Sequence, residues 1–164
     1  MNTRTLDPIA LGDHLDRLVR AAWALCGSRD DAEDLVQETF ARVLARPRVV
    51  QRDDDLGYLL QALRNTFVSA LRTRARRPRA AAAEAESLEL ADTRTGAQPH
   101  AAAEERLVYA AIAALPPEQR DALVAIDLAG LSYREAARAL RVNEGTVTSR
   151  LFRARRGVAR SLAG

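Results

Sequence analysis

The stretch that decides the fold is LSYREAARALRVNEGTVTSRLFRAR, residues 131–155. Ser132 and Glu135 have the S-x-x-E spacing of a capping box, which predicts that a helix begins just after the serine. Polar, turn-prone residues follow it, and Asn143 is a candidate N-cap for a second helix over about residues 144–159. Two short helices joined by a tight turn, the second rich in arginine, are typical of a helix-turn-helix that places one helix in the DNA major groove.

The second of these helices has two contrasting faces. Its apolar residues recur at steps of four, three and four, and so form one inward stripe: Val147, Leu151, Ala154 and Val158. The other face combines hydroxyls, an aromatic ring and arginines, which suit base edges and thymine methyls, with flanking arginines for phosphates. The residues predicted to contact duplex DNA are Thr146, Thr148, Ser149, Arg150, Phe152, Arg153, Arg155 and Arg156. The alternative is a basic C-terminal helix whose charge only suits its dipole, but the paired caps and outward phenylalanine favour DNA binding.

Composition favours helices and contact with nucleic acid at both ends. Hydrophobic residues make up 48% of the 164 residues and aromatics 4%, and much of the apolar content is alanine, which favours close-packed helices over sheets. Residues 1–79 carry 14 arginines against 11 acidic residues, residues 80–105 carry 1 against 6, and residues 106–164 carry 10 against 5. Two basic segments therefore flank an acidic connector.

The sequence lacks the residue patterns expected of disulfide-bonded, metal-binding, catalytic or membrane-spanning proteins. Cys26 is the one cysteine, which excludes an internal disulfide and suits a reducing cytoplasm, and its place on an apolar stripe indicates core packing. His14 and His100 have no partners at metal-ligand spacing, and no nucleophile–base pair or phosphate-binding loop is present, so we expect no enzyme activity, cofactor, metal or small-molecule substrate. The sequence has no apolar run long enough for a membrane span and no signal-peptide core, so a cytoplasmic location is expected.

The first part of the chain predicts two helices and a charged face. A helix over Leu15–Cys26, with Asp13 as its cap, is expected to end at Gly27. A second helix begins near Asp30 or the next residue and stops before Pro47. Its predicted core stripe is Ala32, Leu35, Val36, Thr39, Phe40, Val43 and Leu44. Its opposite face carries Glu33, Asp34, Gln37 and Glu38, which on the residues alone is an ordinary solvated face.

A polar segment over 46–55 reads as a loop, and a long helix follows it, capped by one of Asp53, Asp54 or Asp55. Its predicted core stripe is Leu56, Leu59, Leu60, Leu63, Phe67, Ala70 and Leu71. Its other face is polar at first and basic later: Tyr58, Gln61, Asn65, Ser69, Arg72 and Arg76. This pattern suits a groove for single-stranded nucleic acid, but equally a soluble helix with a basic end, and the residues leave both open.

The predicted organisation is all-α. A helical domain over 1–79 is followed by a flexible acidic linker over 80–100 and by a four-helix domain over 101–164 that ends in the helix-turn-helix. Pro116 and Pro117 separate the first two helices of the second domain.

Taken together, the chain resembles bacterial RNA polymerase sigma factors of the extracytoplasmic-function (ECF) group over nearly its whole length. The resemblance is specific in DAEDLVQETF at 31–40, in LPP at 115–117, and in SYREAA, GTVTSR and RAR within 132–155. It implies a promoter-specificity subunit of RNA polymerase, with an anti-sigma protein as a further partner.

The resemblance also implies roles for the three faces. Glu33, Asp34, Gln37 and Glu38 would dock on the clamp helices of the polymerase's largest subunit. The 46–55 loop and the helix around Asn65 would capture the melted non-template strand of the minus-ten element, with one base flipped into a pocket. The recognition helix would read the minus-thirty-five duplex, and the acidic linker would thread the polymerase's active-site and RNA-exit path.

Three positions depart from the family pattern. Tyr58 stands where the family commonly has Trp, Ala136-Ala137 where it often has Ile-Ala, and Thr148 where it often has a basic residue. The promoter sequence therefore cannot be carried over from the family. Two alternatives remain: a stand-alone helix-turn-helix regulator that binds duplex DNA as a dimer, and a sigma-like decoy that binds only an anti-sigma protein. The N-terminal half shows neither an effector pocket nor a sustained heptad, and the outward arginines disfavour the decoy.

Overall fold

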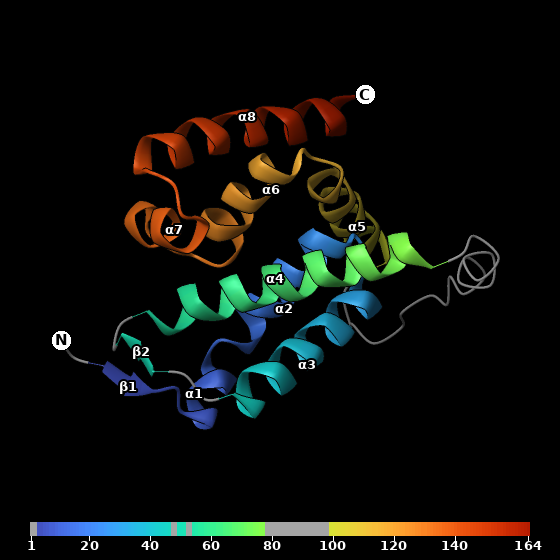
Figure 1. Ribbon diagram of the computed structural model, residues 1–164. Helices are drawn as coiled ribbons and strands as arrows, with labels where there is room; N and C mark the ends of the chain where they lie inside the picture. Colours follow the sequence, from blue (N-terminus) through green and yellow to red (C-terminus); the bar gives the residue numbers. More distant parts are fainter. Residues whose placement is uncertain (1–2, 47–48, 52–53, 78–98) are drawn as a thin grey trace.

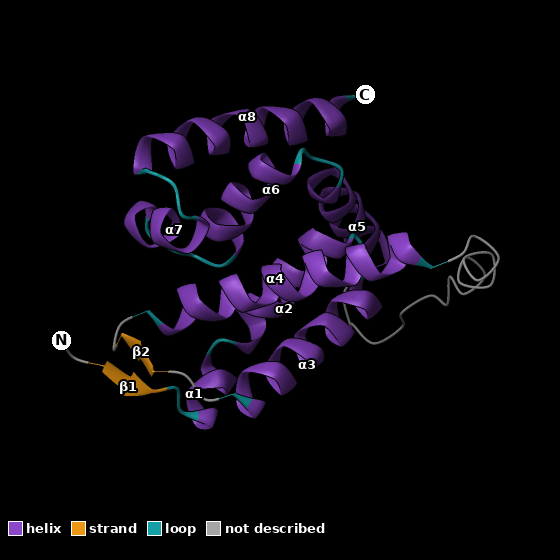
Figure 2. Ribbon diagram, viewed as in Figure 1, coloured by secondary structure: helices purple, strands orange, loops and turns teal. Residues whose placement is uncertain are grey.

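The computed structural model describes residues 3–46, 49–51, 54–77 and 99–164, and these residues are predominantly helical (Figures 1 and 2). The elements in chain order are β1 (Thr3–Thr5), α1 (Pro8–Asp13), α2 (Leu15–Cys26), α3 (Arg29–Ala45), β2 (Val49–Gln51), α4 (Asp55–Arg76), α5 (Pro99–Ala113), α6 (Pro117–Leu123), η2 (Val124–Leu128), α7 (Tyr133–Leu140) and α8 (Glu144–Ala163). The all-α prediction is thus confirmed, with a short two-stranded ribbon added to it.

Helices α2, α3 and α4 pack together as the N-terminal module. Gly27 ends α2 in the left-handed conformation (φ 74°), and the Ser28 hydroxyl caps α3 by accepting from the Asp31 amide. The predicted cap for α2 was wrong, because Asp13 belongs to α1 and His14 occupies the cap position without a side-chain bond. The predicted stripes are largely buried, although Leu44 and Leu71, toward the C-terminal ends of α3 and α4, are about half exposed.

The loop predicted over 46–55 contains strand β2, which pairs antiparallel with β1. The register places Arg4 opposite Val50, which is buried. An ion pair from Arg4 to Asp55 ties the ribbon to the first turn of α4. Asp54 occupies the N-cap position of α4, as one of the three predicted candidates. Its side chain, however, accepts no hydrogen bond from the first turn of the helix.

The C-terminal module follows the predicted capping chemistry closely. The Ser132 hydroxyl accepts from the Glu135 amide (3.3 Å), and the Glu135 carboxylate accepts from the Ser132 amide (2.7 Å), which completes the capping box of α7. Asn143 caps α8 by accepting from the Thr146 amide at 2.7 Å. The turn between the two helices is made by Arg141 in the left-handed conformation (φ 57°), a position where glycine is usual.

The two modules pack against each other and share one continuous hydrophobic core. Figure 1 shows α5 lying beside α2, and α6 and α7 lying above α4, with α8 on the outer side. The rings of Trp23 in α2 and Tyr109 in α5 stack with centroids 4.0 Å apart and an interplanar angle of 5°. Most of the predicted flexible linker lies outside the described residues, but its last two positions, Pro99 and His100, belong to α5 and correct that boundary.

Candidate nucleic-acid and partner interfaces

The outward face of α8 has the predicted orientation. Val147, Leu151 and Ala154 are fully buried against the module, and Val158 is partly buried. The opposite side exposes Phe152 at 61%, which is unusual for a large apolar side chain in solvent. The predicted contact residues Thr148, Ser149, Arg153 and Arg156 are exposed with it, and Thr146 is partly buried.

Small contacts within α8 organise this face. The guanidinium of Arg156 lies 5.7 Å from the centroid of the Phe152 ring, so the charge and the aromatic form one surface. The Thr148 hydroxyl donates to the Glu144 carbonyl (2.9 Å), and the Ser149 hydroxyl donates to the Thr146 carbonyl (3.1 Å). Both hydroxyl oxygens therefore present acceptor lone pairs outward. Within the described parts of the chain Arg153 forms no ion pair, and its charge faces solvent.

The two flanking arginines of α8 are engaged inside the module. Arg155 makes a bidentate ion pair with Asp127 of η2, with Nε–Oδ2 and Nη2–Oδ1 distances of 3.0 and 2.6 Å, which raises the pKa of the guanidinium. Arg150 reaches Glu118 of α6 at 3.2 Å. The sequence suggested phosphate contacts for both, but in the structure they brace α8 against the helices beneath it.

The predicted polar face of α4 is only partly solvent-exposed. Asn65, Arg72 and Arg76 are exposed, whereas Tyr58, Gln61 and Ser69 are half-buried. The exposed arginines lie at the C-terminal end of the helix, as expected from the charge pattern. The structure thus exposes an amide and a basic end on this face, while Tyr58 packs partly against the hydrophobic core.

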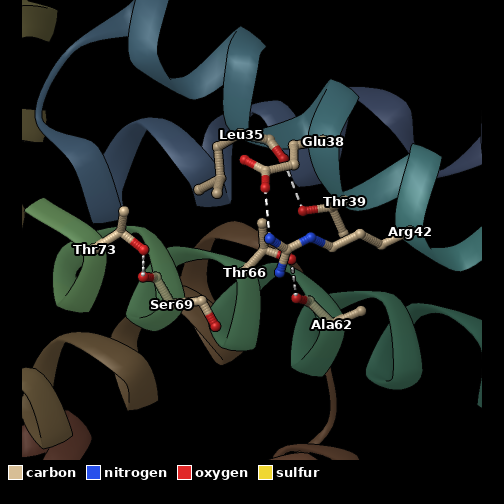
Figure 3. Close-up of polar contacts among 8 residues, drawn as sticks. All are labelled: Leu35, Glu38, Thr39, Arg42, Ala62, Thr66, Ser69 and Thr73. Atoms are coloured by element: carbon tan, nitrogen blue, oxygen red, sulfur yellow. Dashed lines mark hydrogen bonds and ion pairs between the residues drawn. The ribbon is translucent and has the colours of Figure 1, made fainter.

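Buried hydroxyls allow α3 and α4 to pack closely behind this surface. Thr39 in α3 and Thr66 in α4 are almost fully buried, and each donates to a carbonyl of its own helix, at 2.7 Å to Leu35 and 2.9 Å to Ala62 (Figure 3). Because each hydroxyl is satisfied locally, neither needs a partner across the seam. The sequence pattern had marked only the first of these as a core residue.

The acidic face of α3 is exposed as predicted, and it borders a groove that the sequence did not reveal. Glu33, Asp34, Gln37 and Glu38 are all exposed, and Glu38 pairs with Arg42 one turn later at 2.6 Å (Figure 3). The groove, of about 320 Å³, is lined by apolar and charged side chains that include Asp34, Leu35, Glu38, Phe67, Leu71 and Arg74. An apolar floor with acidic groups along one rim suits a partner helix with apolar and basic side chains.

Cys26 lies in the wall of this groove and is only partly buried. Burial, together with the nearby Asp31 carboxylate, raises the pKa of the thiol to about 11. The thiol is therefore uncharged and unreactive at neutral pH, in agreement with the expected packing role.

Three residues that sequence reasoning missed connect the modules. Arg64 of α4 donates from Nε to the Asp121 carboxylate of α6 at 2.5 Å, and Asp121 is only 8% exposed. Arg120 places its guanidinium 5.2 Å from the centroid of the Phe67 ring. No local pattern could have found them, because each contact joins residues more than fifty positions apart.

The described residues contain no cluster of three or more His, Cys, Asp or Glu side chains able to hold a metal ion. No helix among them has the length and apolar character needed to cross a membrane.

Comparison with known proteins identifies both modules. Residues 11–77 match the family described as Sigma-70 region 2, and residues 105–156 match Sigma-70, region 4. The first range covers α2 to α4 with the polar face and all of the groove except Ala113, and the second covers most of α5 and continues into α8.

Whole proteins agree with these matches. The chain is 38% identical over 143 residues to the ECF RNA polymerase sigma factor SigE of Mycolicibacterium smegmatis, covering 87% of this chain and 56% of that protein. It is 37% identical over 135 residues to the ECF RNA polymerase sigma factor EcfG of Rhodopseudomonas palustris, covering 82% of this chain and 72% of the relative. The chain thus spans little more than half the length of the first relative.

A solved structure extends the similarity to the arrangement of the modules. The sigma factor RpoE of Bartonella quintana, crystallised with the anti-sigma factor NepR, superposes with a TM-score of 0.72 at 27% identity, over 94% of this chain and 95% of that one. CnrH, in complex with the cytosolic domain of CnrY, shares the fold at 23% identity and a TM-score of 0.61, over 96% of this chain and 90% of that one. The chain belongs to the family of ECF RNA polymerase sigma factors.

Proposed function

We propose that this chain is a promoter-specificity subunit of bacterial RNA polymerase that directs transcription initiation in the cytoplasm and has no enzyme activity of its own. The proposal is supported by two separate candidate nucleic-acid faces, on α4 and α8, and by an exposed acidic face on α3 in the same chain. A duplex-binding regulator would need only one of them.

The acidic face of α3 docks the polymerase. Asp34 and Glu38 stand at the edge of the apolar groove, and Glu33 and Gln37 extend the same exposed face. In such an interface the apolar floor contributes to the affinity for a partner, and the charged groups beside it fix the partner's orientation. We assign this surface to the clamp helices of the largest polymerase subunit.

The polar face of α4 holds the melted minus-ten strand. Tyr58 supplies a stacking surface, Gln61 and Asn65 supply amides for base edges, and Ser69 lies next along the helix. The exposed Arg72 and Arg76 attract the phosphates. Unstacking a base costs a few kcal/mol, which stacking on an aromatic side chain and hydrogen bonds to the base can offset.

The outward face of α8 reads the minus-thirty-five duplex. Arg153 and the Phe152–Arg156 pair are exposed, and Thr148 and Ser149 offer hydroxyl groups beside them. Thr146 lies in the first turn, near the helix N-terminus that favours phosphate. Arg150 and Arg155 hold the helix in place through their ion pairs with the module beneath it.

An anti-sigma protein is a further partner in this proposal. The similarity to the NepR-bound RpoE chain covers both modules, so this chain has the shape of a sigma factor captured with its inhibitor.

Reconstituted transcription tests the proposal. The protein is mixed with core RNA polymerase and a genomic promoter library, and promoter-dependent initiation is expected; no initiation on any template would refute the proposed function. Asp34→Ala with Gln37→Ala should weaken polymerase binding about tenfold or more, because both side chains lie in the docking face. Glu104→Ala, an exposed acid on α5, is the matched control and should leave polymerase affinity unchanged. Equal affinities for all three proteins would remove the docking assignment.

A further inference from the structure

The strand β1 lies before the part of the chain that matches the sigma family. The match to Sigma-70 region 2 begins at residue 11, whereas β1 spans Thr3–Thr5 and pairs antiparallel with β2, Val49–Gln51. Figure 1 shows the ribbon of β1 and β2 beside the start of α4. The first residues of the chain are therefore bound to the segment that leads into the helix with the proposed strand-binding face.

The ribbon has one side against the N-terminal module and one side in solvent. Arg4 is paired with Val50, and paired residues of an antiparallel ribbon point to the same side. Val50 is buried in the hydrophobic core, and so is Leu6, which directly follows β1. Thr5 and its partner Val49 are exposed on the other side. The pairing therefore directs Arg4 toward the module, where it meets α4.

The ion pair between Arg4 and Asp55 fixes the ribbon to the first turn of α4. The carboxylate of Asp55 is largely removed from water, since the residue is 7% exposed, and among the described residues Arg4 is the one cation paired with it. Loss of that cation would leave a buried carboxylate uncompensated, which is strongly unfavourable. The pair joins residues 51 positions apart, so the first turn of α4 depends on the start of the chain.

Asp55 lies at the head of the proposed strand-binding face. Tyr58, Gln61 and Asn65 follow it at steps of three, three and four residues, which is the spacing of neighbours along one helix surface. The amide of Tyr58 also donates to the carbonyl of Asp54, at 3.0 Å, so the same turn sets where the tyrosine ring lies. A change at Asp55 is therefore transmitted first to the aromatic residue of that face.

We propose that β1 is a positioning element for recognition of the minus-ten element, and that Arg4 acts through Asp55 to hold the first turn of α4 and the Tyr58 ring in the orientation that receives the melted strand. The inference rests on the proposed function and adds to it a segment outside the matched family regions. Arg4 is a positioning residue, because its guanidinium is engaged by Asp55 and acts without touching DNA. The first residues of the chain thus take part in the choice of minus-ten sequence.

Transcription by the reconstituted holoenzyme tests this role. Core polymerase with each variant is given two promoter libraries, one randomised at the minus-ten element and one at the minus-thirty-five element. Arg4→Ala should lower initiation from the preferred minus-ten sequences by about tenfold and broaden the base preference there, an effect of the size that one charged hydrogen bond supports. The minus-thirty-five preference should stay unchanged, because α8 belongs to the other module. Arg4→Lys keeps the charge and should restore most of the activity.

Further variants separate positioning from direct DNA contact and from loss of structure. Asp55→Asn keeps Arg4 but removes its partner, and it should reproduce the minus-ten defect. Arg106→Ala removes an exposed arginine of α5, and as the control for total charge it should behave like the wild type. Far-UV circular dichroism verifies that each variant keeps its helices. If Arg4→Ala loses them, Arg4→Gln with Asp55→Asn leaves no buried charge unpaired and takes its place, with the same expected defect.

Three results would overturn the positioning role. The first is a folded Arg4→Ala variant with the wild-type minus-ten preference. The second is a defect in Arg4→Ala that Asp55→Asn does not share, which would show that Arg4 contacts DNA directly. The third is an equal change of preference in both libraries, which would show a general loss of structure. A wild type that initiates on no template refutes the proposed function instead, so the two failures are distinguishable.

Discussion

The two helices that carry the candidate nucleic-acid faces use their arginines differently. In α8, Arg150 and Arg155 pair with acids of their own module, so the outward Arg153 stands on a helix that is already fixed. In α4, Arg64 pairs with an acid of the other module. The ion pairs that fix the proposed duplex-reading face therefore lie within one module, whereas an arginine beside the proposed strand-binding face is held by the other module.

The largest effect expected from this comparison is on duplex binding. Arg153→Ala should reduce affinity for a minus-thirty-five duplex by about 5- to 150-fold, equivalent to about 1–3 kcal/mol, because it removes an exposed guanidinium from the reading face. The free energy of unfolding should change by less than about 0.5 kcal/mol, since the side chain is exposed and forms no ion pair among the described residues. Fluorescence anisotropy at one fixed salt concentration measures the affinity.

Arg160→Ala provides the control for this variant. Arg160 is also exposed but lies in the last turn of α8, beyond the proposed reading face. If Arg153→Ala and Arg160→Ala reduced duplex affinity by the same factor, α8 would bind DNA through its total positive charge alone. The special role proposed for the position of Arg153 would then be wrong.

A smaller effect is expected at the start of α7, whose position fixes the turn into α8. Ser132→Ala removes the hydroxyl of the capping box and should lower the free energy of unfolding by about 1 kcal/mol, as measured by urea denaturation. The N-cap of α3 offers a comparison, because Ser28 accepts from the Asp31 amide at a longer 3.4 Å and should contribute less when it is changed to alanine.

The stability that this capping box contributes depends on pH, and the direction of the dependence follows from the pKa of Glu135. Hydrogen bonds from the Ser132 hydroxyl and amide lower the pKa of the Glu135 carboxyl below its usual 4.5. A lowered folded-state pKa stabilises the protein above the unfolded value, and this contribution disappears as pH falls through the folded value. The stability difference between wild type and Ser132→Ala should therefore shrink below about pH 4.5, and a difference that grows in acid would contradict the assignment.

Local features were predictable from the sequence. The capping box and Asn143 were found because each involves residues within one turn, and the buried stripe of α8 follows from helical spacing. The exposed Phe152 was correctly placed by the same spacing. The exposed and buried sides of α8 could thus be predicted from its own residues, and DNA contact by the exposed side stays a prediction.

Non-local features could not be derived. The β1–β2 ribbon pairs three residues at the start of the chain with three near position 50, too short a pattern to be recognised. Trp23 and Tyr109 lie on different helices, and nothing in either segment indicates that their rings stack. The pairing of Arg150 and Arg155 with acids of α6 and η2 was missed for the same reason, and both were interpreted as free phosphate contacts.

The smallest effect concerns Arg155 and distinguishes bracing from phosphate contact. The side chain of Arg155 is 55% exposed and that of its partner Asp127 is 31% exposed, so the surface pair contributes only about 0.2–1 kcal/mol to stability. Arg155→Gln should lower the free energy of unfolding by that amount. The decisive measurement is the slope of log affinity against log salt concentration, which falls by about one when a phosphate contact is removed. We expect Arg155→Gln to leave the slope unchanged, because Asp127 already neutralises the charge; a slope reduced by about one would show that the arginine leaves its partner to hold a phosphate.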